Sequence, residues 1–348
     1  MIKIKTSVAT VAVALFVTAC GGGGGNDAAV APPVAVTPPV VSPPQSVVTP
    51  ADIQTTVPVL TYATTSEEFM FVSALNKFRA DTGLGLLAQS AMLDSAAVKH
   101  LDYVLKNDVL NGGTVNMRVN DAVTGRSMFH IEQADKPLFT GVEELDRAKA
   151  VGYRGSYVGE ELTFGGGKGA HVALGGIIST VYHRAGLMMQ GVNDVGVAVG
   201  PDRSQTVVME MGTTKAQSQA SDFVGVYPAA NQTAVGLNAG VETPNPFPEL
   251  STANDDFPTK TGYPVSVVVK EGVTVEVLTF TLTEAGAAGP MDARILTKDN
   301  DPNRYLSSNI AFLVAKSPLK AGTVYTAKFS GRVNNAVVNK EWKFTTRN

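Results

Sequence analysis

The segment FMFVSALNKFRADTGLGLL, residues 69–87, decides the first half of the fold. Its apolar residues recur at helical spacing: Phe69, Val72, Leu75 and Phe78. Gly83 then ends the repeat, as a left-handed helix cap would. The preceding TSEE, residues 65–68, has the pattern of a capping box, which predicts that Thr65 caps this helix.

A second helix and a hairpin are predicted further along the chain. The helix follows Ser90, and its apolar stripe is formed by Leu93, Ala97, His100, Leu101 and Val104. Helical character returns over residues 170–182. Apolar residues then alternate over 195–199 and 207–211, on either side of the turn-like sequence PDRS. Helices around an antiparallel hairpin indicate an α+β region.

The last hundred residues have a different pattern of apolar and turn-forming residues. They contain short alternating runs over residues 265–269, 273–277, 310–314 and 325–329. Gly, Pro and Asn punctuate these runs, which predicts an antiparallel β-sandwich. The stretch PLKAGTVYT, residues 318–326, resembles the end of immunoglobulin-like modules in bacterial surface proteins.

The N-terminus has the pattern of an export signal. Lys3 and Lys5 precede an apolar run that ends at Ala19, too short for a stable membrane span. The residues VTAC, 17–20, resemble a bacterial lipobox, and Cys20 is the one cysteine of the chain. The resemblance implies that Cys20 is lipidated and holds the protein to the membrane of the cell envelope. Gly21 after the cysteine favours the outer membrane over the inner one.

These patterns divide the chain into five parts. They are a signal peptide over 1–19, a Gly/Pro-rich linker over 20–64, an α+β domain over 65–214, a second linker over 215–244 and an immunoglobulin-like β-sandwich over 245–348. The linker prolines fix φ and favour an extended stalk.

The composition excludes two classes of site. The 28 basic and 31 acidic residues give a net charge of −3 without a basic block, so no nucleic-acid partner is expected. With one cysteine, neither an intrachain disulfide nor a paired-cysteine zinc site can form.

Several segments in the α+β region, in order, resemble the CAP superfamily in its bacterial form (SCP/PR-1-like domains). They are LNKFR at 75–79, the helix LDSAAVKHLDY at 93–103, RAKAVGY at 147–153, GEEL at 159–162, and TVYHR at 180–184. The resemblance covers about 150 residues and implies an α-β-α sandwich. It also implies that His100, Glu160 and His183 line one cleft, with Glu161 and His130 at its margin.

Three interpretations of that set remain open. His100 and His183 suit a divalent metal such as zinc, with a carboxylate or water completing the site. Without metal, Glu160 is a catalytic candidate that polarises a histidine for acid–base work. Alternatively, the residues tie helices to the sheet by hydrogen bonds. The family's second glutamate is replaced by Ser179 and Thr180, which leaves its catalytic tetrad incomplete.

Two functions follow, and the sequence does not decide whether the chain is an enzyme. One is a membrane-anchored envelope lipoprotein whose CAP domain binds a lipid, glycan or protein ligand. The alternative is a zinc-assisted or Glu/His hydrolase that acts on peptides or cell-envelope polymers. Familiar hydrolase motifs such as Gly-x-Ser-x-Gly and His-Glu-x-x-His are absent from the sequence, which favours binding.

Overall fold

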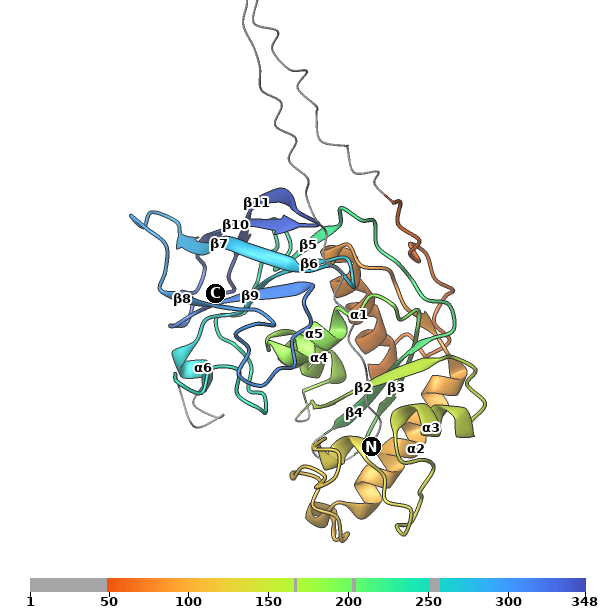
Figure 1. Cartoon of the computed structure of the whole chain (residues 1–348). Helices are drawn as coiled ribbons and strands as arrows, with labels where there is room; N and C mark the ends of the chain where they lie inside the picture. Colours follow the sequence, from red (N-terminus) through yellow and green to blue (C-terminus); the bar gives the residue numbers. More distant parts are fainter. Residues whose placement is uncertain (1–48, 166–167, 202–204, 251–256) are drawn as a thin grey trace, which may run out of the picture. The chain divides into compact units, whose positions relative to one another are not determined.

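The computed structural model describes residues 49–165, 168–201, 205–250 and 257–348 (Figure 1). The predicted signal peptide, Cys20 and the linker up to residue 48 lie outside the described residues. The helices are α1 Glu67–Thr82, α2 Ala91–Asn107, α3 Glu144–Ala150, α4 Ala170–Ile178, α5 Tyr182–Leu187 and α6 Phe257–Lys260, with 3-10 turns η1 Val109–Asn111 and η2 Met128–His130. Within the described part of the chain, no helix is both long and apolar enough to cross a bilayer.

The strands follow in the same order along the chain. They are β1 Ala88–Gln89, β2 Tyr157–Phe164, β3 Asp194–Val199, β4 Thr206–Thr213, β5 Val224–Tyr227, β6 Val265–Val269, β7 Val275–Glu284, β8 Ala293–Leu296, β9 Ile310–Ala315, β10 Val324–Val333 and β11 Ala336–Thr345. The chain therefore mixes helices and sheets, as the α+β prediction requires.

Local hydrogen bonds fix the two long helices of the first region. Ser66, one residue after the predicted cap, starts α1 by accepting a bond from the Phe69 amide at 3.2 Å. Gly83 ends α1 at φ 79°, in the left-handed conformation that its sequence predicts. Ser90 caps α2 through the Leu93 amide at 3.4 Å. The capped ends place His100 in the middle of α2.

A four-stranded sheet lies between two helical layers. Its order is β1-β3-β4-β2, and β3 and β4 form the predicted antiparallel hairpin. Alternate residues of β4 enter different cores: Met209 packs with α1 and α4, whereas Val208 packs with α2. Helices α2 and α3 therefore cover one face of the sheet, and α1, α4 and α5 cover the other (Figure 1). Strand β2 is an edge strand.

The second region is made of two antiparallel sheets. One has the order β11-β10-β7 and the other β5-β6-β9-β8. Strand β7 contacts β8 and β9 across the sheets. Phe280 and Phe329 pack edge to face at 5.5 Å between ring centroids in the shared apolar core. This region is therefore mostly β, as predicted, but it also contains the short helix α6.

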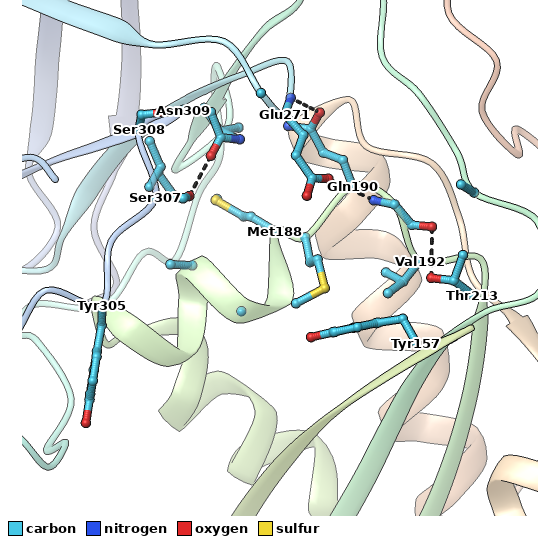
Figure 2. Close-up of a pocket in the computed structure, with 18 of the residues that line it drawn as sticks. Tyr157, Met188, Gln190, Val192, Thr213, Glu271, Tyr305, Ser307, Ser308 and Asn309 are labelled. Carbon is cyan, nitrogen blue, oxygen red and sulfur yellow. Dashed lines mark hydrogen bonds between the residues drawn. The ribbon is translucent and has the colours of Figure 1, made fainter. Parts of the chain in front are cut away.

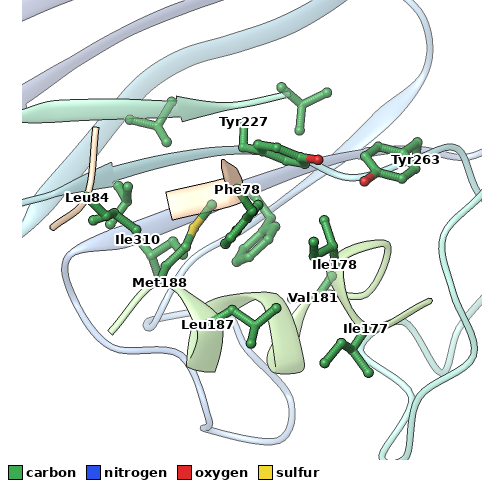
Figure 3. Close-up of a cluster of buried hydrophobic side chains, with 14 of the residues drawn as sticks. Phe78, Leu84, Ile177, Ile178, Val181, Leu187, Met188, Tyr227, Tyr263 and Ile310 are labelled. Carbon is green, nitrogen blue, oxygen red and sulfur yellow. The ribbon is translucent and has the colours of Figure 1, made fainter. Parts of the chain in front are cut away.

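The stretch predicted as the second linker, 215–244, supplies part of this architecture. Its residues 224–227 form β5, which pairs antiparallel with β6. Tyr227 of β5 meets Phe78 of α1 edge to face, with ring centroids 4.8 Å apart. Both rings belong to one continuous apolar cluster that spans the two regions (Figure 3). The first linker also takes part, because Gln54 donates to the Leu86 carbonyl at 2.9 Å.

A buried arginine strengthens the connection between α5 and the sheets. The Arg184 guanidinium donates to the Pro264 carbonyl at 2.6 Å. It also lies over the rings of Tyr227, Tyr263 and Phe312, at 5.0, 4.9 and 5.8 Å from their centroids. Such cation–π contacts stabilise a desolvated guanidinium. Arg184 follows His183 directly, so the same contacts position that histidine.

Candidate functional site

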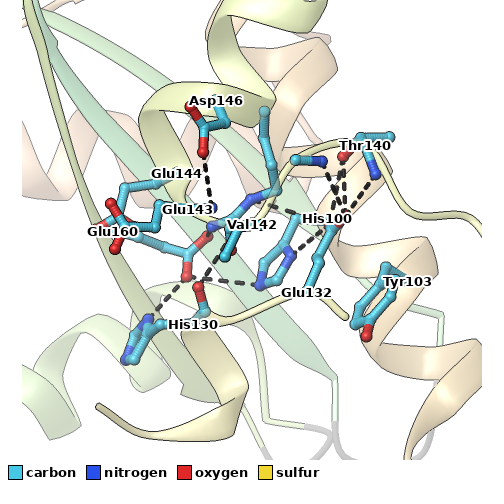
Figure 4. Close-up of polar contacts among 12 residues, drawn as sticks. His100, Tyr103, His130, Glu132, Thr140, Val142, Glu143, Glu144, Asp146 and Glu160 are labelled. Carbon is cyan, nitrogen blue, oxygen red and sulfur yellow. Dashed lines mark hydrogen bonds and ion pairs between the residues drawn. The ribbon is translucent and has the colours of Figure 1, made fainter. Parts of the chain in front are cut away.

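His100 lies in a fully buried position on α2, and both of its ring nitrogens are occupied (Figure 4). Nδ1 is 2.9 Å from Oε1 of Glu132, and Nε2 is 2.8 Å from the Phe129 carbonyl oxygen. A carbonyl only accepts, so Nε2 must donate. Oε2 of Glu132 also accepts from the Thr140 amide at 2.6 Å. Hydrogen bonds therefore hold the ring through both of its nitrogens.

Glu160 on β2 is the centre of this cluster, and its side chain is completely buried. Its Oε2 accepts from Nη2 of Arg147 at 2.6 Å, and its Oε1 lies 2.7 Å from Nδ1 of His130. Nε2 of His100 is 3.5 Å from the same Oε1. Burial opposes ionisation, but Arg147, His100 and His130 together outweigh it and hold the pKa of Glu160 well below its usual range. Glu160 is a carboxylate.

Glu210 on β4 stands directly opposite Glu160 in the strand register. Two charged carboxylates facing each other in a dry interior would repel strongly. Burial, and next the charge of Glu160, raise the pKa of Glu210 well above its usual range. Glu210 therefore keeps its proton, although neither of its buried oxygens has a hydrogen-bond partner among the described residues. Arg147 approaches Glu210 no closer than 3.9 Å.

His183 on α5 belongs to a different group of contacts. Its Nδ1 is 3.4 Å from Oε2 of Glu242. Glu242 also accepts from the amides of Val181 and Tyr182 at 2.7 and 2.8 Å, and so caps the start of α5. Burial lowers the pKa of His183, but Glu242 and Glu161 more than compensate and raise it to about 9. His183 is therefore cationic at neutral pH, with 30% of its side chain exposed.

Glu161 connects the two groups electrostatically. Successive residues of a strand point to opposite faces, so Glu161 faces away from Glu160. Its carboxylate lies against α5, where a Cβ added to Gly186 would come within 2.3 Å of it. Burial raises the pKa of Glu161 to about 7, although the positive charges of His183 and His130 oppose this. Glu161 therefore titrates near neutral pH at the edge of the sheet.

The predicted site is divided by the edge strand. The structure brings His100 and Glu160 together on the α2 face, and it adds His130, which the sequence placed only at the margin. It places His183 with Glu161 and Glu242 on the α5 face. The side chains of His130 and His183 are 27% and 30% exposed, so these imidazoles are the accessible ones.

Zinc does not fit these residues as they lie. A metal needs a free nitrogen lone pair, and both nitrogens of His100 are engaged, by Glu132 and by the Phe129 carbonyl. The raised pKa of His183 favours its protonated form, and the oxygens of Glu160 are engaged by His130 and Arg147. In the part of the chain that the structure describes, no three His, Cys, Asp or Glu side chains are grouped so as to hold a metal.

Sequence reasoning missed three members of the cluster. Arg147 begins the RAKAVGY segment that carries the family resemblance, but nothing in that pattern indicates a buried ion pair with Glu160. Glu132 follows His130 by two residues in a segment without regular periodicity. Glu210 lies within the alternating apolar run of β4. A glutamate among valines and methionines in a predicted buried strand is the sequence feature that could have indicated a functional or paired carboxyl group.

Comparison with solved structures gives partial likenesses, among them two bacterial proteins. No family model matches the chain, and no curated protein matches it. An outer surface protein from Borrelia burgdorferi is 13% identical and has a TM-score of 0.31, covering 44% of this chain and 97% of its own length. A DUF4426 family protein from Pseudomonas aeruginosa is also 13% identical, with a TM-score of 0.23, covering 38% and 94%. With scores this low, neither likeness indicates what the chain does.

Proposed function

We propose that the chain is a lipid-anchored envelope protein whose CAP-type domain binds a lipid, glycan or protein ligand. The lipobox-like VTAC ending at Cys20 supports the anchor. The CAP assignment is supported by the ordered motifs and by a sheet that carries helices on both faces. The two antiparallel sheets that follow support an immunoglobulin-like second module. Binding rather than catalysis is the activity that the site favours.

The observation that carries this choice is that the buried groups of the cluster mainly bind one another and the backbone. Nη2 of Arg147 donates to Glu160 and Nη1 to the His130 carbonyl, and Nε2 of His100 donates to the Phe129 carbonyl, which stabilises the fold around η2 and β2. The side chains that a ligand can reach are those of His130, beside Glu160, and His183, beside Glu242, because both are partly exposed. A cationic His183 beside a titrating Glu161 provides polar recognition without a nucleophile.

One observation favours the hydrolase alternative. Nδ1 of His130 is held by the Glu160 carboxylate at 2.7 Å, and Arg147 orients that carboxylate. An imidazole fixed in this way through one nitrogen resembles a general base, which uses its other nitrogen to activate a hydroxyl or water. The described residues place no hydrogen-bond partner on Nε2 of His130.

The experiment separates binding from turnover. Full-length protein carrying Cys20→Ser, which removes the lipid as a binding force, is incubated with isolated peptidoglycan and with vesicles of phosphatidylethanolamine and phosphatidylglycerol. Co-sedimentation measures binding, and soluble sugars, peptides or fatty acids measure turnover. We expect co-sedimentation without released product.

Variants then assign the effect to the site. Binding should fall in His130→Ala and His183→Ala but not in His171→Ala, which removes an exposed histidine of α4 outside the cluster. Product release that His130→Ala abolishes would establish the hydrolase instead. Absence of binding to both the peptidoglycan and the vesicles would contradict the glycan and lipid forms of the proposal.

A further inference from the structure

A cavity of about 570 Å³ lies where the first region meets the second, and none of the histidines lines it (Figure 2). The first region contributes α5 with the residues that follow it, the start of β2 and the end of β4. The second region contributes the turn between β6 and β7 and the segment before β9. Its volume is in the range of pockets that enclose small organic ligands.

The lining has one ionisable acid and no basic residue. Its larger aromatic, thioether and acidic side chains are Tyr157, Tyr182, Tyr305, Met188, Met189 and Glu271, and Gln190, Asn309 and three hydroxyl residues add neutral polar groups. Tyrosine rings attract cations through their π faces, and methionine adapts to irregular apolar ligands. The pocket therefore combines a polarisable apolar wall with a single negative charge.

Hydrogen bonds from the first region hold Glu271 in place. Gln190 bridges the two regions, because its Oε1 accepts from the Glu271 amide at 2.8 Å and its Nε2 donates to the Val269 carbonyl at 2.7 Å. The Gly191 amide donates to Oε2 of Glu271 at 3.2 Å. Figure 2 shows the carboxylate pointing into the space above Met188. Among the described residues, no Lys, Arg or His forms an ion pair with it.

The surroundings of Tyr157 show that the potential here is negative. Burial raises the pKa of the Tyr157 phenol, and the carboxylates of Glu144 and Glu271 raise it further. The nearest opposing cation, Arg126, is itself paired with Glu144 at 2.7 Å. An anionic ligand would be repelled by this negative potential and by the Glu271 carboxylate. A neutral ligand would displace water from that carboxylate without supplying a compensating charge.

We propose that this pocket binds an alkylammonium ion. The ammonium group pairs with the free oxygen of Glu271, and the hydrocarbon body packs on Met188 and the Tyr157 ring. The charged hydrogen bond supplies selectivity for a cation, while burial of the chain supplies affinity. The preformed Gln190 bridge lowers the cost of ordering the site. A free amine and a lysine side chain of another protein both carry this chemistry.

Isothermal titration at pH 7 tests the charge preference with three probes of equal chain length. The full-length chain with Cys20→Ser is titrated with hexylammonium, hexanol and hexanoate. We expect hexylammonium to bind at least about tenfold more tightly than either of the others, the effect of one charge-assisted hydrogen bond. A parallel titration with acetyl-lysine methylamide shows which source of the ammonium group fits better, and binding of either ammonium probe supports the proposal.

Glu271→Gln keeps an acceptor for the Gly191 amide and removes only the charge. It should weaken hexylammonium binding by about tenfold and leave the melting temperature unchanged. The matched control is Glu276→Gln on β7, where the glutamate is exposed, pairs with Arg332 at 3.0 Å and lies outside the pocket. Equal binding of hexanoate and hexylammonium, no binding of either ammonium probe, or no effect of Glu271→Gln would overturn the proposal.

Discussion

The hydrogen bonds of His100 determine which chemistry is open to its ring. Because Glu132 engages one nitrogen and the Phe129 carbonyl the other, the ring as it lies offers no free lone pair to zinc. His100→Ala should therefore leave zinc affinity unchanged. It should lower the free energy of unfolding by about 3 kcal/mol, because the Glu132 charge loses a buried partner. Zinc calorimetry and urea unfolding measure the two effects.

The control for that experiment is His171→Ala, which removes an exposed histidine and should change neither quantity. Tight zinc binding by the wild type that disappears in His100→Ala would restore the metal-site interpretation. It would require the ring to give up its bond to Glu132 or to the Phe129 carbonyl.

The proton on Glu210 makes the stability of the chain depend on pH. With a raised pKa, the native chain keeps a proton that the unfolded chain loses above its ordinary pKa of 4.5. The group therefore costs about 1.4 kcal/mol of stability for each pH unit between 4.5 and its native pKa. Glu210→Gln keeps the size of the side chain but carries no ionisable proton. The variant should be more stable than the wild type at pH 7 and similar to it at pH 4.

Denaturant unfolding across that pH range checks this slope. The exposed Glu276→Gln serves as the control and should shift the curve little. A loss of stability in Glu210→Gln at pH 7 would mean that Glu210 is ionised and acts as a second carboxylate partner of Arg147.

At the scale of residues, only part of the site could be predicted from the sequence. His100 and Glu160 lie in motifs that resemble the CAP superfamily, and the structure does bring them together. His130 was placed only at the margin because it ends a three-residue 3-10 turn, where no periodic pattern indicates a direction. Its bond to Glu160 spans 30 residues and depends on how the loop before α3 folds back.

At the scale of elements, regular local patterns were predictable and long-range pairings were not. Helices α1 and α2 follow from apolar periodicity and polar caps, and the β3–β4 hairpin follows from alternation around a turn. Strand β5 is four residues long and pairs with β6, which lies about forty residues further along the chain. A run of four residues is too short to show a strand periodicity in the sequence. Its strand geometry comes from pairing with β6.

The contribution of β5 can be measured by comparing two fragments. A fragment of residues 245–348 leaves β6 as an unpaired edge and removes the Pro228 carbonyl that accepts from the Trp342 indole at 2.9 Å. A fragment of 221–348 retains both contacts. We expect the longer fragment to unfold at higher urea, with a difference of about 2 kcal/mol for the lost pairing and the orphaned indole. Equal midpoints would show that β5 is held by the sheet without stabilising it.

At the scale of the whole molecule, the described residues form one compact unit, and the predicted anchor lies outside it. A single apolar cluster runs from α1 to the sheets of the second region, and Arg184 reinforces it. The 570 Å³ pocket lies at the same junction, so its walls depend on both regions being present. A ligand in that pocket would stabilise the pair of regions as a unit, and the stabilisation would grow with the logarithm of its concentration over its dissociation constant.

Attachment to the membrane should depend on one atom, the sulfur of Cys20. The net charge of −3 and the lack of a basic block give no electrostatic attraction to anionic lipids. Acyl chains on Cys20 would contribute about 0.8 kcal/mol for each buried methylene, enough for stable anchoring with two or more chains. Cys20→Ser should move the protein from the membrane pellet to the soluble fraction after a high-salt wash. Ser42→Ala, a change of similar size in the linker, should leave it in the pellet, and retention of Cys20→Ser would show that another part of the chain holds the membrane.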